Sequence, residues 1–365
     1  MKRRKFLASA GLAGTAGLLA GCDRQPETAA ECAQNRAQEQ FEWKMVTAWP
    51  RDFPGLGMGA NRLAERIGQM SGGRLSVKVF GGNELVPPFE VFDAVQQGTA
   101  EMGHAAPYYW KGKIPAAQFF AGVPFGMTAQ ELNGWFYYGG GIDLWQETYA
   151  PFGVVPFPIG NSSGQMGGWF NKEINSLEDL KGLKMRIPGL GGEVLKRAGG
   201  TPQNIPGAEI FTALQTGTID ATEWVGPLND QAYGLQQAAK YYYYPGWHET
   251  GTALEAIINQ QALDALPEDL RQIVKYACQS ANLDMLSEFM ARNGESLAQL
   301  RESGVDIRAF PGDVLRELQR LTGEVLMDIV EDDPVSARVY ESFTGFLNTV
   351  RDWSAISEKF ILNLR

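Results

Sequence analysis

A pattern of strands and helices occurs twice in this chain, and it constrains the fold more than any other sequence feature. Residues 43–106 are predicted as strand, helix, strand, helix, strand, and residues 180–224 repeat that order. The second helix of each unit ends in the same signature, Phe-x-x-x-Gln-x-Gly-Thr, at 92–99 and at 211–218. Alternating strands and helices are typical of a mostly parallel sheet covered by helices. The repeat therefore predicts two similar α/β lobes.

The individual elements follow from hydrophobic periodicity and from the Gly and Pro residues that bound each segment. Strands are predicted at 43–49, 74–80, 100–106, 180–188 and 219–224, with a further edge strand at 305–310. Helices are predicted at 55–73, 87–98, 190–200, 207–217, 262–304, 311–331 and 335–365. Two α/β lobes joined by long helices are the expected architecture of a hinged binding protein.

The length of the chain and its net charge limit the possible classes of function. A chain of 365 residues exceeds one typical core, which favours two domains. The net charge of −10 argues against nucleic acid as a partner, because nucleic acid favours clustered Lys and Arg. A small anionic ligand is not excluded, since a local cationic pocket can exist on an acidic protein.

The first residues, MKRRKFLASAGLAGTAGLLAGC, predict export. A basic start with Arg3 and Arg4 precedes a short Gly/Ala-rich apolar run, which is too short for a stable membrane span. The final LAGC resembles a lipoprotein cleavage box. We therefore expect a twin-arginine-type lipoprotein signal at 1–22, a lipid on Cys22 and a flexible tether at 23–42. The protein would then lie in the periplasm, anchored to the membrane; the alternative is a plain secretory signal in which Cys22 is incidental.

Charged side chains stand where the predicted strands end. In open α/β sheets, ligands bind outside the carboxyl ends of strands, so these ends should face one cleft. Arg186 follows a strand, and its planar guanidinium suits a carboxylate. Glu223 ends a strand and Glu249 follows a tyrosine run. Two carboxylates that converge on a cleft repel each other unless a proton or a cation lies between them. The alternative is that all three are surface charges.

Three segments carry a family resemblance. The stretch KMRIPGLGGEVLKRAGGTPQNIPGAEIFTALQTGTIDATEWVGP at 184–227 resembles the solute-binding components of tripartite ATP-independent periplasmic (TRAP) transporters. GQMGGWF at 164–170 and YYYYPGWHETG at 241–251 are similar to the branch that binds 2-oxoacids or 2-hydroxyacids with a metal ion. The resemblance runs from about residue 43 to the C-terminus.

This resemblance implies a two-lobed periplasmic binding protein fold of the α/β class. Each lobe would be a mixed sheet flanked by helices, with long helices crossing between the lobes and at the C-terminus. We expect lobe I to comprise 43–163 plus 254–292, and lobe II to comprise 164–253 plus 293–365.

The resemblance also implies a site. One metal ion would be held by Gln165, Glu223, the main-chain carbonyl of Trp224, and Glu249. The expected substrate-binding residues are Arg186, Gln165, Tyr108, Tyr109, Trp224 and Asn229. Two glutamates, one arginine and one ligand carboxylate carry a formal charge of −2, which calcium neutralises and sodium does not. The charge balance favours calcium over sodium as the bound metal ion.

The expected function is extracytoplasmic capture of a small 2-oxo- or 2-hydroxy-monocarboxylate and its delivery to a TRAP membrane permease, without catalysis. One alternative keeps the fold but binds a sugar acid or polyol. Another is a metal-dependent hydrolase or lyase built on Glu223 and Glu249. No nucleophile–histidine arrangement supports catalysis; His104 and His248 are the only histidines, and His248 is expected beside Glu249. The apolar face of 335–365 needs a partner, which is either the chain's own lobes or a second subunit; we expect a homodimer through the C-terminal helix.

Overall fold

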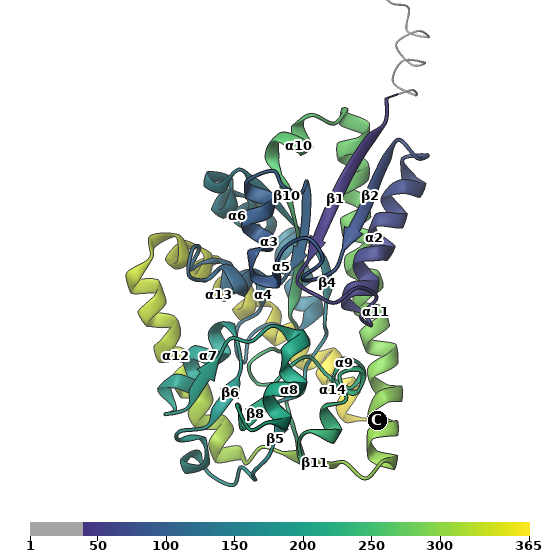
Figure 1. The fold of residues 1–365 in the computed structure, drawn as a ribbon. Helices are drawn as coiled ribbons and strands as arrows, with labels where there is room; N and C mark the ends of the chain where they lie inside the picture. The colour runs from purple at the N-terminus through teal and green to yellow at the C-terminus, as the bar shows by residue number, and fades with distance from the viewer. Residues whose placement is uncertain (1–38) are drawn as a thin grey trace, which may run out of the picture. The chain divides into compact units, whose positions relative to one another are not determined.

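The structure, a computed structural model that describes residues 39–365, contains two β-sheets with helices around them (Figure 1). The first sheet has five strands in the order β2 (Leu75–Phe80), β1 (Phe41–Thr47), β3 (Met102–Ala105), β10 (Ala253–Asn259) and β4 (Val154–Asn161). The second has six, in the order β11 (Asp306–Ala309), β9 (Tyr241–Tyr244), β5 (Gly168–Phe170), β8 (Ala221–Thr222), β6 (Lys184–Arg186) and β7 (Thr201–Gln203). We call the parts built on these sheets lobe I and lobe II. The predicted signal and Cys22 lie outside the described residues.

The predicted repeat is confirmed. In lobe I, β1 pairs in parallel with β2 and β3, and in lobe II, β6 pairs in parallel with β7 and β8. The connecting helices are α2 (Leu56–Met70) and α3 (Val91–Gln96) in the first unit, and α7 (Gly189–Arg197) and α8 (Ile210–Gln215) in the second. Gly98 and Gly217 end the matched helices at φ 74° and 73°. Glycine adopts this left-handed region without a steric penalty, which explains the shared signature.

Both sheets are mixed, as the resemblance implied. β10 runs antiparallel to β3 and to β4, and β5 runs antiparallel to β8 and to β9. The predicted edge strand at 305–310 is confirmed as β11, parallel to β9.

Several boundaries differ from the prediction. β1 begins at Phe41, inside the predicted tether, because the Phe41 N–H donates to the carbonyl of Arg74 at 2.7 Å. The strand predicted at 219–224 is shorter, since β8 comprises only two residues. The Glu223 N–H still donates to the carbonyl of Arg186 at 3.1 Å, so the chain leaves the sheet directly after that contact. Glu223 and Trp224 therefore lie beyond the strand rather than on it.

The helices that follow link and cover the lobes. α11 (Glu268–Glu302) packs on β4 and α2 in lobe I and on α9 (Pro227–Ala232) in lobe II. Figure 1 shows it running along the right-hand side of both sheets. Its buried side chains include Met285 and Phe289. The helix predicted at 262–304 is divided, since α10 (Gln260–Asp264) ends before Pro267.

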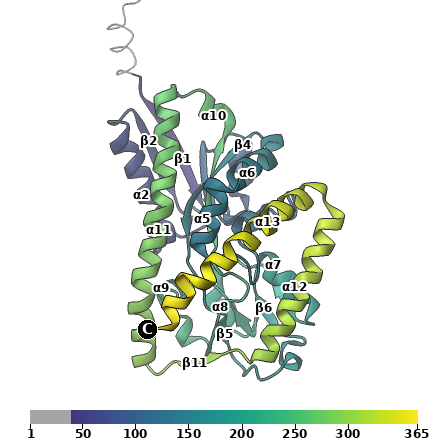
Figure 2. The ribbon, with the colours of Figure 1, turned by 180° about the vertical axis from the view of Figure 1, so that it is seen from behind.

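The C-terminal segment is also divided. α12 (Gly312–Asp332) is followed by α13 (Pro334–Ile356), and the chain then breaks at Ser357 before α14 (Glu358–Asn363). Seen from behind, α13 runs obliquely toward the C-terminus (Figure 2). It packs on three lobe I helices, α4 (Ala117–Ala121), α5 (Ala129–Tyr138) and α6 (Gly141–Tyr149). Among residues 39–365, no helix combines the length and the apolarity needed to cross a membrane.

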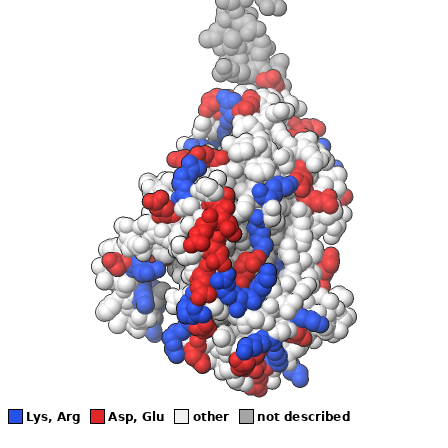
Figure 3. Space-filling view, turned by 90° about the vertical axis from the view of Figure 1, so that its left-hand side faces the viewer, with Lys and Arg blue, Asp and Glu red and all other residues white. Residues whose placement is uncertain are grey.

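Charges on the outer helices neutralise one another locally. Figure 3 shows the left-hand side of the view in Figure 1, where acidic and basic side chains lie interleaved. Arg197 on α7 pairs with Glu324 and Asp328 on α12, and Arg320 pairs with Glu317 on the same helix. Exposed pairs of this kind contribute about 0–1 kcal/mol each, so they shape the surface potential more than the stability.

Gly168 provides a test of the packing between β5 and β8. Its φ is 115°, and an added Cβ would lie 2.4 Å from the carbonyl oxygen of Thr222. We expect Gly168→Ala to lower the free energy of unfolding by roughly 2–4 kcal/mol, through backbone strain and displacement of β8. Urea denaturation measures the free energy of unfolding of the variant and of the wild type.

The matched control is Gly323→Ala, in the middle of α12, where an added Cβ meets nothing within 4 Å. This variant should be as stable as the wild type or more stable by up to ~1 kcal/mol, because alanine is the better helix former. A Gly168→Ala variant as stable as the wild type would show that β5 and β8 can separate at no cost.

Candidate functional site

Four charged or amide side chains from separate elements of lobe II meet between the two sheets. Arg186 ends β6, Glu223 follows β8, Gln165 precedes β5, and Glu249 lies between β9 and β10. All four are buried, and Arg186 and Glu223 have relative exposures of only 1% and 0%. The residues that the sequence placed at strand ends therefore do come together.

Arg186 is held from several directions. Its guanidinium forms a buried ion pair with Glu223, and its Nε donates to the carbonyl of Ile205 at 3.1 Å. The guanidinium carbon lies 5.0 Å from the centre of the Trp224 ring, which covers one of its faces. Such a planar fork, fixed in a buried site, is suited to receive a carboxylate.

Glu249 lies beside a second set of polar groups. The Gln165 amide nitrogen donates to Glu249 Oε2 at 2.7 Å and to the Ser162 hydroxyl at 2.9 Å. The Thr252 hydroxyl also donates to Glu249. Burial raises the pKa of Glu249 to about 7, and the nearby charge of Glu223 adds to the rise. A carboxyl in this position takes up a proton readily unless a cation is present.

The same region can hold a metal ion. Glu223, His248 and Glu249 each offer a ligand atom, and these atoms lie within 4.8 Å of one another. Gln165 Oε1 and Glu223 Oε2 are buried and have no hydrogen-bond partner among the described residues. Two carboxylates and an amide oxygen fit a hard cation such as calcium or sodium, which prefers oxygen ligands. The donor set therefore fits the metal that the sequence suggested.

His248 lies close to both glutamates. We expected it beside Glu249, and its ring offers a ligand atom within 4.8 Å of those of Glu223 and Glu249, with Nε2 at 3.4 Å from Glu223 Oε2. Neither ring nitrogen has a hydrogen-bond partner among the described residues. The imidazole therefore belongs to the polar cluster and borders the carboxylate that pairs with Arg186.

Lobe I contributes two tyrosines from the short turn η2 (Pro107–Trp110). The Tyr109 hydroxyl accepts a hydrogen bond from Arg186 Nη2 at 3.4 Å, and its ring is perpendicular to that of Tyr108 with centroids 5.0 Å apart. Burial raises the pKa of Tyr109 to about 12, so its hydroxyl stays protonated and can donate to an anion. Trp49 of lobe I meets Trp224 edge-on at 6.1 Å.

The space between these side chains is small. A cavity of about 10 Å³ is lined by Trp49, Leu56, Tyr108, Tyr109, Ser162, Gln165, Trp224, Val225, Thr252 and Leu254. That is about the room needed by one water molecule. A ligand of several heavy atoms therefore requires the side chains of the two lobes to move apart before it enters.

Asn229 has a different environment. Its Nδ2 donates to the carbonyl of Pro54 at 2.7 Å, which joins α9 of lobe II to the loop before α2 of lobe I. It is not among the residues that line the small cavity.

Ser162 and Thr252 do line the small cavity, and sequence reasoning missed both. Their positions three residues from Gln165 and from Glu249 were the available signal.

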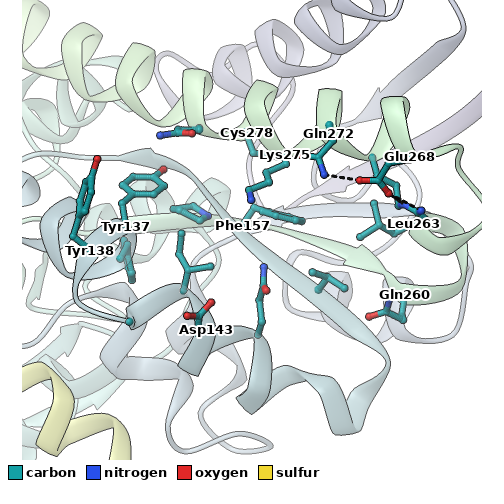
Figure 4. Close-up of a pocket in the computed structure, with 18 residues that line it drawn as sticks. Tyr137, Tyr138, Asp143, Phe157, Gln260, Leu263, Glu268, Gln272, Lys275 and Cys278 are labelled. Atoms are coloured by element: carbon teal, nitrogen blue, oxygen red, sulfur yellow. Dashed lines mark hydrogen bonds and ion pairs between the residues drawn. The ribbon is translucent and has the colours of Figure 1, made fainter.

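A larger hollow of about 830 Å³ lies elsewhere in lobe I, between α6, β4 and α11. Figure 4 shows Lys275 and Gln272 on one side, Asp143 on the other and Phe157 between them. β4 is the edge strand of its sheet, but Pro156 and Pro158 have no N–H to offer to an added strand. Its lining does not include the buried arginine and glutamates described above, so it is not the candidate site.

Comparisons with known proteins identify the family of the chain. Residues 45–333 match the family described as bacterial extracellular solute-binding protein, family 7. A monocarboxylate 2-oxoacid-binding periplasmic protein from Nostoc sp. is 41% identical over 358 residues, which cover 98% of this chain and 97% of that protein.

Two solved structures are similar throughout. A TRAP periplasmic solute-binding protein from Colwellia psychrerythraea, with bound calcium and pyruvate, is 43% identical at a TM-score of 0.87 and covers 90% of this chain and 100% of its own. A counterpart from Pseudoalteromonas atlantica T6c, with bound sodium and pyruvate, is 43% identical at a TM-score of 0.87, covering 89% and 99%. With its two mixed sheets and buried site between them, the chain belongs to family 7 of the bacterial extracellular solute-binding proteins, the solute receptors of TRAP transporters.

Proposed function

We propose that this receptor captures a small 2-oxo- or 2-hydroxy-monocarboxylate together with a metal ion and delivers it to a TRAP permease. The observation that carries the proposal is the buried Arg186 guanidinium beside Glu223 and Glu249. A cationic fork next to two carboxylates suits a ligand that presents one carboxylate to the arginine and its remaining oxygens to a cation. The names of the similar proteins support this chemistry.

Each site residue receives a role in this proposal. Gln165, Glu223, the carbonyl of Trp224 and Glu249 would hold the metal, with calcium favoured over sodium by the charge balance. The metal would neutralise the carboxylates and offer a position to the ligand oxygens. Arg186 clamps the ligand carboxylate, and Tyr108 and Tyr109 donate hydroxyls to it from lobe I. Asn229 contributes through its contact with Pro54, which draws the two lobes together.

Titration calorimetry of the protein from residue 23 onward tests this function. Pyruvate, lactate, 2-oxobutyrate and longer 2-oxoacids are added with calcium, with sodium alone and with a chelator. We expect that binding requires a metal. NMR spectra of the ligand should show that it is not converted to another compound. Binding of sugar acids or polyols alone would favour the alternative ligand class. Turnover of a 2-oxoacid would favour a metal-dependent hydrolase or lyase.

Arg186→Lys should weaken pyruvate binding by about ten- to a hundredfold at saturating calcium. Lysine keeps the charge but loses the fork that can bind a carboxylate through two parallel hydrogen bonds. Calorimetry of the variant measures the change, and Arg197→Lys on the surface of α7 is the matched control, with no loss expected. An unaffected Arg186→Lys variant would remove Arg186 from the role of anchor.

Calcium affinity in the absence of ligand should depend on pH through Glu249. Burial raises the pKa of this carboxyl to about 7, so below that pH a proton competes with the metal. We expect the dissociation constant for calcium to be about tenfold higher at pH 6 than at pH 8. In Glu249→Gln, calcium should bind more weakly and this pH dependence should disappear. A constant affinity between pH 6 and 8 in the wild type would contradict the assignment of Glu249.

We also propose a homodimer through the C-terminal end of the chain. Phe343 on α13 is buried against Trp135, with ring centroids 5.4 Å apart, so the first half of the helix covers its own lobe I. The last part is exposed, and its large apolar side chains are Trp353, Ile356, Phe360, Ile361, Leu362 and Leu364. An exposed apolar surface of this kind is typical of a contact between proteins.

Light scattering should therefore give the mass of a dimer for the wild type. A double variant, Trp353→Glu with Phe360→Glu, should give the mass of a monomer, because two charges at the centre of an apolar contact are costly to bury. Tyr138→Glu is the control, since Tyr138 is 94% exposed on α5 and lies outside this surface. A monomeric wild type would refute the dimer.

The lipid on Cys22 stays a prediction, because that residue lies outside the described part of the chain.

A further inference from the structure

Glu255 is a buried acid that the proposed function does not use. It lies in β10 with a relative exposure of 0%, inside lobe I. No lysine, arginine or histidine forms an ion pair with it among the described residues. A carboxyl group in an apolar core is destabilising unless it is hydrogen-bonded, so its presence calls for a physical reason.

The Glu255 side chain accepts a hydrogen bond from one buried side chain. The Trp110 indole N–H donates to Glu255 Oε1, and both side chains are buried. Trp110 is the last residue of η2, the turn that carries Tyr108 and Tyr109. Its ring also packs on Phe92, with centroids 5.4 Å apart. The hydrogen bond therefore fixes the turn from inside lobe I, at the end opposite to the ligand.

The position of Glu255 in the sheet brings its side chain close to Trp110. Its Cα lies opposite Ala105 in β3, two residues before Pro107 opens the tyrosine turn. The register between β10 and β4 shifts between Leu254 and Glu255, which marks a local irregularity in the strand. Such irregularities redirect side chains, and this one occurs where the Glu255 carboxyl must reach Trp110.

β10 also connects with the metal-binding side of the site. Thr252 directly precedes the strand, and its hydroxyl donates to Glu249. Glu255 follows three residues later and holds Trp110. The start of β10 and the residue before it thus contact both halves of the site: the carboxylate cluster through Thr252, and the tyrosine turn through Glu255.

We propose that Glu255 is a positioning residue, which holds Trp110 and thereby sets Tyr108 and Tyr109 against Arg186 and the incoming carboxylate. Glu255 lies behind the turn and does not touch the ligand. Its contribution is to fix the orientation of the Tyr109 hydroxyl, which already meets Arg186 at 3.4 Å. This proposal rests on the proposed function, because it concerns the affinity for the same carboxylate.

The protonation of Glu255 indicates which substitution should be tolerated. Burial raises the pKa of Glu255 to about 8, and the hydrogen bond from the Trp110 N–H only partly opposes the rise. At neutral pH the group is therefore mostly a neutral acid that accepts one hydrogen bond. Glutamine has nearly the same shape and also accepts that bond, whereas leucine fills the space without accepting it.

The test compares Glu255→Leu, Glu255→Gln and Trp110→Phe. At saturating calcium, Glu255→Leu and Trp110→Phe should each weaken pyruvate binding by about tenfold, and Glu255→Gln by less than about threefold. The double variant Glu255→Leu with Trp110→Phe should be no weaker than either single variant, because both remove the same hydrogen bond. Calcium affinity measured without pyruvate should stay within about twofold of the wild type in all of them, since the metal-binding residues are not displaced.

Trp145→Phe is the matched control. Trp145 is another fully buried tryptophan of lobe I, and its indole nitrogen has no hydrogen-bond partner among the described residues. The same substitution there should leave the pyruvate affinity unchanged. Additive losses in the double variant, or equal losses of calcium and pyruvate affinity, would overturn the positioning role. A wild type that binds none of the carboxylates would instead overturn the proposed function, and this proposal with it.

Discussion

The buried pair of Arg186 and Glu223 is the interaction on which the site depends. Taking two charges out of water is unfavourable, and their attraction offsets this only when neighbouring groups satisfy the remaining hydrogen bonds. Ile205 and Tyr109 supply such groups to the arginine, while Trp224 covers its face. The glutamate keeps one oxygen without a partner. The pair is therefore stable in a closed site and still open to a further cation.

The two lobes contribute different kinds of side chain to the site. Lobe II carries the charges: Arg186, Glu223 and Glu249 all come from segments that follow its strands. Lobe I carries neutral hydroxyls and aromatic rings on a turn after β3. Charge is thus concentrated in lobe II, and lobe I faces it with neutral groups, which cost less to desolvate than charges.

Much of this was predictable from the sequence, because the signals were local. The glycines that end α3 and α8 revealed the repeat, and strand ends pointed to Arg186 and Glu223. The positions of Thr252 and Glu255 were not predictable in the same way. They depend on how β10 returns to lobe I and on the register it adopts against β4. Contacts between segments far apart in sequence leave no periodic pattern, and a resemblance identifies only those residues that its motifs contain.

The two prolines in β4 have a consequence for how copies of this chain can associate. An open sheet edge normally invites another strand, which is a common route to ordered polymers and to aggregates. Pro156 and Pro158 remove two donors from the edge, and the Gln146 side chain donates to the Pro156 carbonyl at 3.4 Å. Growth of the first sheet from molecule to molecule is therefore blocked at this edge. The other strands that lie at sheet edges, β2, β11 and β7, contain no such pair of prolines next to an acceptor that is already bonded, so β4 is the edge where the sequence itself prevents the addition of a strand.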